Sequence, residues 1–329
     1  MKITPFITGS GMAGKGMAKS LGIIGVINPD FQIAPHVQIK RDQSLMGLTK
    51  GVENPLLLLG NPHGYRAEMI LEGEKAGFNW IVADKPVCIN KDDIPRLKNV
   101  KANVAVTHGF RQNWGPQTIK KMIDAGEFGE IISVEGRYWQ SSAATSALAG
   151  HPGSSKEWKQ DRKLNGPYDA FVDLGAHYAD LMFFFAGSTP TQSRAWVSHV
   201  NAPAAHRDTH AHMEFIFPKF RARGSISKTA HGTGNDLEIT VLGAKCSATW
   251  HVERPDELRI ARGTEKHIVQ KPNDNFGSRQ PPFHGMGWIE GYTDIIHNVL
   301  MHMAGHKTSY PTLPESLRVM ETLLTVETK

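Results

Sequence analysis

Three polar residues interrupt one of the most apolar stretches of the sequence. Asp173, His177 and Asp180 stand at positions i, i+4 and i+7 of segment 172–186, which is otherwise rich in Phe, Leu, Met and Ala. On a helix this spacing places the three side chains on one face. Buried ionisable groups are costly unless they are partnered. Two interpretations stay open: ion pairing within the packed helix, or a proton-transfer site in which His177 acts as acid or base near neutral pH.

A glycine-rich turn near residue 10 is a candidate anion site. Gly9, Gly11 and Gly14 form the pattern G-x-G-x-x-G, with Met12 and Ala13 between the second and third glycines. A strand pattern precedes the turn and a helical pattern follows it. In a dinucleotide-binding unit the first glycine permits a tight turn, the second lets the backbone approach a pyrophosphate, and the third lets the helix pack on the strand. We therefore expect a dinucleotide at the N–H groups of the helix N-terminus.

The same segment also matches the start of a nucleotide-triphosphate loop, G-x-x-x-x-G-K, from Gly9 to Lys15. That motif continues with a Ser or Thr that binds magnesium. Residue 16 is a glycine, so the magnesium ligand is missing and we do not expect an NTPase.

The residues after the second predicted strand bear on the choice between NADP and NAD. They read Gln38-Ile39-Lys40-Arg41-Asp42. Lys40 and Arg41 would bind a ribose 2′-phosphate, which favours NADP. Asp42 would bind free ribose hydroxyls, so NAD stays open.

The elements around these residues predict two domains within an α/β fold. Strand and helix patterns alternate over residues 1–122, which favours a Rossmann domain with a doubly wound parallel sheet. Over residues 123–329 strand patterns follow one another with few helices between them, which favours an α+β domain with a large, mostly antiparallel open sheet. The predicted strands cover 3–8, 36–40, 56–59, 80–83, 103–107, 130–138, 192–199, 212–218, 222–228, 237–242, 247–251 and 257–261. The predicted helices run from the glycine turn to about 21 and over 65–76, 92–98, 172–186, 288–303 and 315–327, and 143–149 is a predicted loop.

Three ordered motifs resemble those of the Gfo/Idh/MocA family, the group of glucose-fructose oxidoreductase and inositol dehydrogenase. The first is the glycine turn. The second is Gly60-Asn61-Pro62-His63-Gly64-Tyr65, followed by Asp84-Lys85-Pro86, which is similar to the family's T-P-x-x-x-H segment and its E-K-P motif. The third is Asp173-Leu174-Gly175-Ala176-His177-Tyr178-Ala179-Asp180, which matches D-x-G-x-H-x-x-D. The order and spacing fit across nearly the whole chain.

The resemblance implies a nicotinamide cofactor, NADP or NAD, with further contacts from Asn61, Pro62, His63, Asp84 and Lys85. Asp84 stands where the family has Glu and keeps the carboxylate, whereas Gly60 and Tyr65 depart from the common residues. The family's open sheet commonly mediates assembly, so a homodimer or homotetramer through the C-terminal sheet is implied.

Lys85, Asp173 and His177 are the predicted catalytic residues. Oxidation of a carbinol requires a base for the hydroxyl proton, and reduction requires an acid for the developing alkoxide. We assign this proton transfer to His177. Lys85, at the carboxyl end of a strand, would polarise the reacting oxygen, and Asp173 would orient His177 or Lys85 or hold a substrate hydroxyl. Asp180 is equally well explained as a structural residue.

Four more residues are candidates for substrate contacts. Arg111 follows a predicted strand, and Trp114 and Tyr168 are aromatic side chains that could stack on a sugar ring. His284 lies in Pro282-Phe283-His284-Gly285, just before a predicted helix.

Composition excludes several classes of protein. The net charge of +5 is spread over 329 residues without a run of five basic residues, so no nucleic-acid partner is expected. No apolar run approaches the roughly 18 residues of a membrane helix, and the first residues do not form a signal peptide, so we expect a cytoplasmic protein without a membrane partner. The two cysteines form no C-x-x-C pair, and His206, His210 and His212 lack a metal motif, so no metal is expected.

The sequence therefore predicts an oxidoreductase that transfers a hydride between NAD(P) and a hydroxyl or carbonyl carbon of a sugar, sugar derivative or cyclic polyol. Two alternatives stay open: a non-catalytic NAD(P)-binding regulator of the same fold, and a reductase of a non-sugar carbonyl or imine. The presence of Lys85, Asp173 and His177 together argues against the regulator, which needs none of them.

Overall fold

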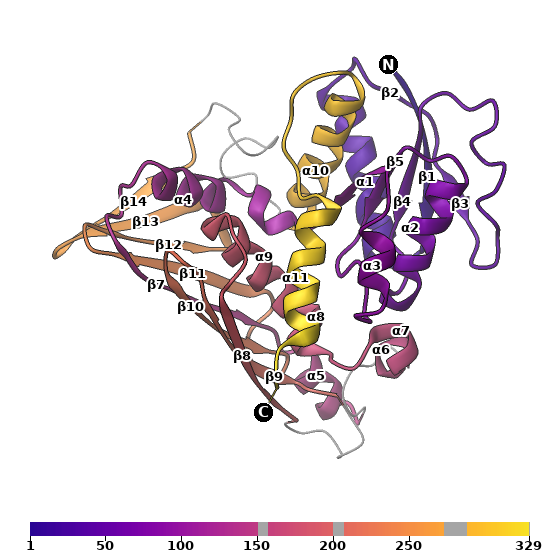
Figure 1. Cartoon of the computed structure of the whole chain (residues 1–329). Coiled ribbons are helices and arrows are strands. Elements are labelled where there is room, and N and C mark those ends of the chain that lie inside the picture. The colour runs from indigo at the N-terminus through magenta and orange to yellow at the C-terminus, as the bar shows by residue number, and fades with distance from the viewer. Residues whose placement is uncertain (151–156, 200–206, 273–287, 329) are drawn as a thin grey trace. The chain divides into compact units, whose positions relative to one another are not determined.

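The computed structural model describes residues 1–150, 157–199, 207–272 and 288–328. The chain divides into two compact units: Met1–Gln112 with Trp288–Glu321, and Asn113–Gly287 with Thr322–Lys329. Each unit contains one sheet (Figure 1). The predicted α/β class is confirmed, with a parallel sheet in the first unit and a mostly antiparallel sheet in the second.

The sheet of the first unit is parallel throughout. Its order is β2-β1-β4-β5-β6, and β3 also pairs with β1. All its strands point the same way, so their carboxyl ends, including the end of β1 at Thr8, lie along one edge. The strands are β1 Lys2–Thr8, β2 Gln32–Ile33, β3 Val37–Ile39, β4 Pro55–Leu59, β5 Trp80–Ala83 and β6 Asn103–Val106.

Helices cover both faces of this sheet, because alternate strand residues point to opposite sides. On one side Ile3, Ile7, Leu56 and Leu58 share a core with α1 (Met12–Ile27) and α10 (Trp288–Met303). On the other side Leu57 and Ile81 lie so close to Gly73 of α2 (Arg66–Lys75) that a Cβ there would come within 2.6 Å of Leu57. The helix α3 (Asp93–Leu97) contacts α2.

The division of the chain differs from the expected boundary between residues 122 and 123. The helix α10 belongs to the first unit, because Ile295, Ile296, Val299 and Leu300 complete the core beside β1 and β4. A Cβ on Gly16 of α1 would lie 2.7 Å from the ring of Trp288, so these two helices pack closely.

The helix α4 (Trp114–Asp124) joins the second unit because it contacts β12 and β13. The helix α11 (Leu313–Thr325) starts in the first unit and ends in the second.

The sheet of the second unit has eight strands in the order β14-β13-β12-β11-β7-β10-β9-β8. Every neighbouring pair is antiparallel except β7 with β10, which is parallel. The strands are β7 Ile131–Trp139, β8 Gln192–Ser198, β9 His210–Ile216, β10 Arg221–Ser227, β11 Asp236–Gly243, β12 Ser247–His251, β13 Arg254–Arg262 and β14 Glu265–Gln270.

One aromatic side chain seats α9 (Gly175–Ala186) on this sheet. The ring of Tyr178 lies over Gly136 of β7 and Gly224 of β10, which are register partners. A Cβ would lie 2.7 Å from the ring at Gly136 and 2.5 Å from it at Gly224. The two glycines are therefore needed to bring the helix close to the strands.

Local predictions failed at several places. Residues 143–149, predicted as a loop, lie largely in helix α5 (Ser142–Leu148). Ala143, Ala144 and Ser146 form the buried side of this helix. The sequence did not reveal this side because small residues contrast little with their polar neighbours. The strands β2 and β14 and the short helices α6 (Glu157–Gln160) and α7 (Arg162–Asn165) were not predicted. In the described part of the chain, no helix combines the length and apolarity needed to cross a membrane.

Candidate functional site

The glycine turn after β1 has the backbone geometry that its pattern predicts. Gly9 has a φ of +78°, which favours glycine. A Cβ on Gly14 would lie 1.9 Å from the Gly9 carbonyl oxygen, and one on Gly9 would lie 2.3 Å from the Gly60 carbonyl oxygen. Gly60 is equally constrained, because its Cβ would lie 2.5 Å from the Gly14 amide nitrogen. The loops after β1 and β4 therefore pack backbone to backbone, and Gly60 is a requirement of this turn.

Gly11 differs from these three glycines because its side-chain position is open. Among the described residues, no atom lies within 4 Å of a Cβ placed there. Gly11 is the N-cap of α1, and its neighbour Met12 is 68% exposed. A sixteen-residue helix thus presents its N-terminal N–H groups and positive dipole end beside open space. This arrangement fits the pyrophosphate of a dinucleotide.

The residues predicted to select the cofactor follow β3 directly. Ile39 is the register partner of Thr8, the last residue before the glycine turn. Lys40 and Arg41 are exposed in the next turn, which is closed by hydrogen bonds between Lys40 and Gln43. The two cations are therefore attached to the strand that ends beside the turn.

The loop after β4 carries three of the predicted cofactor contacts. Asn61 accepts a hydrogen bond from the Thr8 hydroxyl at 3.3 Å and, through its carbonyl, one from Arg66 at 2.6 Å. Pro62 precedes a 3-10 helix, His63–Tyr65, in which His63 is buried. Asn61 therefore ties this loop to the end of β1.

Asp84 lies in a buried polar network at the end of β5. Its carboxylate accepts hydrogen bonds from the hydroxyls of Thr107 and Tyr292 and lies 3.5 Å from the buried guanidinium of Arg66. Burial, together with the nearby Asp84 charge, raises the pKa of Tyr292, which keeps this hydroxyl protonated as a donor. Arg66 also donates to the carbonyl of Pro86 at 2.7 Å. Asp84 therefore has a structural task in addition to its predicted contact with the cofactor.

Lys85 is buried in the same segment, with 9% of its surface exposed. Burial lowers the pKa of the neighbouring His108, and the charges of Arg111 and Lys85 lower it further. A neutral His108 next to these two cations avoids a third positive charge in the unit's interior.

In the second unit the predicted helix over 172–186 is interrupted. Asp173 ends the short helix α8 (Ala170–Asp173), and His177 lies in the first turn of α9. At the junction the His177 N–H bonds to the Leu174 carbonyl three residues back, a tighter turn than an α-helix makes. Gly175 lies against the Met213 side chain, where a Cβ would be 3.1 Å from the sulfur. The predicted helix is thus divided at Leu174 into a four-residue helix and a twelve-residue helix, although Leu174 itself keeps helical dihedral angles.

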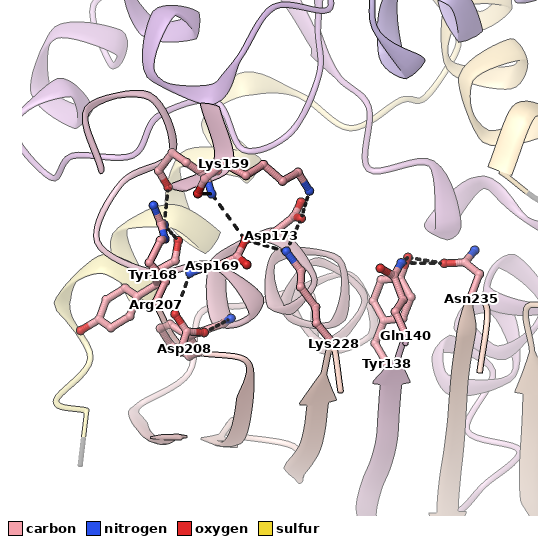
Figure 2. A network of polar contacts seen from close by, with 12 residues as sticks. Tyr138, Gln140, Lys159, Tyr168, Asp169, Asp173, Arg207, Asp208, Lys228 and Asn235 are labelled. Atoms are coloured by element: carbon pink, nitrogen blue, oxygen red, sulfur yellow. Dashed lines mark hydrogen bonds and ion pairs between the residues drawn. The ribbon is translucent and has the colours of Figure 1, made fainter. Parts of the chain in front are cut away.

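Asp173 lies in a dense ionic network (Figure 2). Its Oδ2 lies 2.9 Å from Lys159 Nζ and 2.8 Å from Lys228 Nζ. Lys228 Nζ also lies 2.6 Å from Asp169 Oδ1. Burial would lower the pKa of Lys228, but Asp173 and Asp169 outweigh it and the pKa is raised. Lys228 is therefore a permanent cation.

His177 is partly exposed and lies beside Tyr138 of β7. Their rings meet edge to face with centroids 5.7 Å apart. Burial and the Asp173 charge raise the pKa of Tyr138, whose hydroxyl donates to Asn235 at 2.6 Å. His177 thus lies at the border of the network that contains Asp173 and Tyr138.

The four predicted substrate contacts lie in different environments. Arg111 is buried and ion-paired with Glu315 at 3.1 Å, and Trp114 is buried at the start of α4. Tyr168 packs edge to face on Phe171, and its hydroxyl bonds to Thr328. His284 lies outside the described residues. These arrangements give Arg111 and Tyr168 structural partners.

Lys228, Lys159, Asp169 and Tyr138 were not identified from the sequence. A signal existed for Lys228, because strand alternation places residue 228 on the same side as Ala222, Gly224 and Ile226, which are buried. Lys159 and Asp169 carry no such signal, since Lys159 lies in the short helix α6, which was not predicted, and Asp169 precedes the predicted helix. Lys85 belongs to the first unit, whereas Asp173 and His177 belong to the second.

Comparison with known proteins identifies the family. A model described as the C-terminal alpha/beta domain of an oxidoreductase family, Gfo/Idh/MocA, matches residues 120–326. The chain belongs to the Gfo/Idh/MocA oxidoreductases. This confirms the resemblance inferred from the three sequence motifs.

Several Gfo/Idh/MocA relatives are similar along most of the chain. Levoglucosan dehydrogenase of Pseudarthrobacter phenanthrenivorans is 22% identical over 296 residues, which cover 79% of this chain and 74% of the relative. The structure of an inositol dehydrogenase homolog from Azotobacter vinelandii, complexed with NAD+, has a TM-score of 0.79 at 17% identity and covers 97% of this chain and 93% of that one. A levoglucosan dehydrogenase structure with NADH has a TM-score of 0.82 at 19% identity, covering 98% and 96%. At these identities the structural likeness shows the fold.

Proposed function

We propose that this protein is an NAD(P)-dependent dehydrogenase that acts on a hydroxyl or carbonyl carbon of a sugar, sugar derivative or cyclic polyol. The observation that carries the proposal is the open position at Gly11 between two glycines that admit no side chain. A phosphate group bound against the backbone at the start of α1 would occupy this open space. This explains why residue 11 is a glycine although its protein surroundings would accept a side chain.

The cofactor would be held by the glycine turn and the loops after β3, β4 and β5. Gly9, Gly11, Met12, Ala13 and Gly14 would present backbone N–H groups to the pyrophosphate. A bound nicotinamide supplies the acceptor of the hydride in oxidation and its donor in reduction. The remaining proposed contacts come from Lys40, Arg41, Asn61, Pro62, His63, Asp84 and Lys85.

The cofactor preference rests on Lys40 and Arg41. Both side chains are exposed, and both follow the strand paired with the end of β1. Two such cations would bind a 2′-phosphate, so we propose NADP as the preferred cofactor, although the solved relatives hold NAD+ and NADH. The ratio of the Kd values for NADH and NADPH, measured in wild type and in Lys40→Ala/Arg41→Ala, tests this preference.

The proton transfer is assigned to His177, with Asp173 and Lys85 as its partners. In oxidation the His177 imidazole would accept the hydroxyl proton, and in reduction the imidazolium would return it. Asp173, bound by two lysine ammonium groups, would stay ionised and hold a substrate hydroxyl or the imidazole. The Lys85 ammonium would donate a hydrogen bond to the reacting oxygen and stabilise its developing negative charge.

The substrate class is supported by the relatives and by the chemistry of the network. The names of the relatives include a levoglucosan dehydrogenase and an inositol dehydrogenase homolog, and these names refer to an anhydrosugar and a cyclic polyol. The ion-paired carboxylate and ammonium groups near His177 are suitable hydrogen-bond partners for several adjacent hydroxyl groups of a sugar or polyol.

A matrix of cofactors and substrates tests the proposed function. NADH and NADPH absorbance would be followed with sugars, inositols and keto-sugars, using Lys85→Ala and His177→Ala as inactive controls. Turnover by wild type alone supports the proposal. Cofactor binding without turnover of any sugar or polyol would favour the regulator, and sugar-type activity that survives both substitutions would contradict the assigned roles.

A further inference from the structure

One buried lysine links the two carboxylates that precede α9. Lys228 directly follows β10, and its ammonium lies between Asp169 and Asp173, as Figure 2 shows. The two carboxylates belong to the same short segment, at its start and at the end of α8. A single ammonium group supplied by the sheet therefore fixes the segment that carries Asp173.

We propose that Lys228 is a positioning residue, which holds Asp173 as an ionised carboxylate with its Oδ2 in one place. The inference rests on the proposed function, since Lys228 acts on the reaction only through Asp173. The two distances, 2.8 Å to Asp173 Oδ2 and 2.6 Å to Asp169 Oδ1, are those of charge-assisted hydrogen bonds.

Lys159 binds the same oxygen but is a weaker anchor. Its side chain is 21% exposed, whereas that of Lys228 is 4% exposed. Burial lowers the pKa of Lys159, and the charge of Lys228 lowers it further. The charge of Asp173 raises this pKa but does not outweigh the other two effects. Lys228 contacts two carboxylates and Lys159 one, so Lys228 is the more firmly anchored of the two cations.

Removal of Lys228 would leave two carboxylates close together in a buried site. Asp169 and Asp173 would then repel each other, and the pKa of Asp173 would rise. The charge of Asp173 also acts on titratable groups from the surrounding elements. The groups on which it acts are Lys159 of α6, Lys228, Arg207 before β9 and Tyr138 of β7. Asp169 and His177 lie four residues from it on either side, and Asp208 faces Asp169.

The test uses a double variant that removes one charge of each sign, Lys228→Met/Asp169→Asn. Lys228→Met alone would leave the buried Asp169 carboxylate without its ammonium partner, which would destabilise the fold. The double variant removes both charges of this pair and so avoids that loss of stability. We expect kcat to fall by about tenfold to a hundredfold, with the Kd of NADPH unchanged, because only the positioning of Asp173 is lost. The acid limb of the kcat/KM profile should move to higher pH, because Asp173 loses the ammonium group of Lys228 at 2.8 Å even though Asp169 no longer repels it.

Two further variants separate positioning from general repacking. Lys271→Met removes another buried lysine of the same unit, one that faces Asp256 at 4.0 Å, and should leave kcat and the pH profile as in wild type. Lys228→Arg keeps the charge and should keep the acid limb at its wild-type pH. A double variant with wild-type kcat and pH profile, or an acid limb that moves equally in Lys228→Arg, would overturn the proposal.

A readout without turnover keeps this inference distinct from the proposed function. Infrared difference spectra recorded during a pH titration report the protonated carboxyl of Asp173, assigned by its loss in Asp173→Asn. The band should titrate at higher pH in the double variant than in wild type. An unchanged titration contradicts the role of Lys228 even in an active enzyme, and a shifted one supports it even if no substrate is found.

Discussion

At the scale of single residues, Asp84 decides how firmly the segment of Lys85 is held. Its carboxylate is the charge opposite the buried Arg66, and it also accepts bonds from Thr107 and Tyr292. Arg66 in turn donates to the carbonyls of Asn61 and Pro86. The loops after β4 and β5 therefore both depend on the ion pair between Asp84 and Arg66.

We expect Asp84→Ala to lower the free energy of unfolding by about 3–5 kcal/mol, because it leaves a buried guanidinium without its carboxylate. Urea unfolding followed by circular dichroism measures this loss. Glu68→Ala is the matched control, since Glu68 pairs with Arg96 on the surface of the same unit, where both side chains are about half exposed. Equal losses in the two variants would contradict the anchoring role of Asp84.

Residue types alone identified part of this site and missed the rest for a physical reason. Gly9, Gly11 and Gly14 were predicted because a local turn imposes its requirements on adjacent residues. Lys228 was missed because it is 55 residues from Asp173 in sequence, and the pairing is set by strand order in the sheet. The roles of Lys85, Asp173 and His177 remain predictions.

At the scale of elements, α11 begins with one half of a capping box, the bond from the Thr312 N–H to the Glu315 side chain. Glu315 accepts hydrogen bonds from the N–H and the hydroxyl of Thr312, both at 2.8 Å, and pairs with Arg111. Burial alone would raise the pKa of Glu315, but Arg111 and Thr312 outweigh it and the pKa is lowered. The carboxylate of Glu315 thus fixes the start of the helix.

Glu315→Gln should cost about 1–2 kcal/mol of unfolding free energy near neutral pH, because the cap and the ion pair weaken. A lowered folded-state pKa contributes stability above the unfolded-state value, 4.5, and this stability is lost as the pH falls through the folded-state value. The Tm difference between wild type and variant should therefore shrink from about pH 7 to about pH 3. A difference that stays constant or grows on acidification would contradict this account.

Element types were easier to predict than element partners. The strands Trp80–Ala83 and Ser247–His251 match their predicted ranges, since alternation and bounding polar residues are local signals. The placement of α10 in the first unit, and the parallel pairing of β7 with β10, depend on packing between distant segments. The break between α8 and α9 was missed because Leu174 and Gly175 fit a helical pattern and only their tertiary contacts reveal the turn.

At the scale of the whole molecule, one face of the eight-stranded sheet carries an exposed aromatic side chain. Ala195 and Met213 are buried on the side of Gly175, and alternation therefore places Trp196 and its partner His212 on the opposite face. Trp196 is 41% exposed. A large exposed aromatic on an open sheet is typical of a subunit interface.

We predict that the protein forms a homodimer or homotetramer through this face, and that Trp196→Glu lowers its molar mass in light scattering after size-exclusion chromatography. A buried carboxylate without a partner would oppose association. Met46→Glu is the control, because Met46 is exposed in the other unit and its variant should keep the wild-type mass. A Trp196→Glu variant with unchanged mass would exclude this face as the interface.

The central claim, that the Gly9–Gly14 turn binds a dinucleotide, is tested most directly at Gly11. Gly11→Val places a side chain in open space at the N-cap of α1, where Val is disfavoured, and should lower the free energy of unfolding by no more than about 1 kcal/mol. The same side chain would occupy the approach of the pyrophosphate, so the Kd of NADPH or NADH should rise at least tenfold, about 1.4 kcal/mol. Gly22→Val is the matched control, because its side-chain position on α1 is also open among the described residues. Cofactor fluorescence titrations should show weakened binding in Gly11→Val alone, and equal affinities in wild type and both variants would contradict the account.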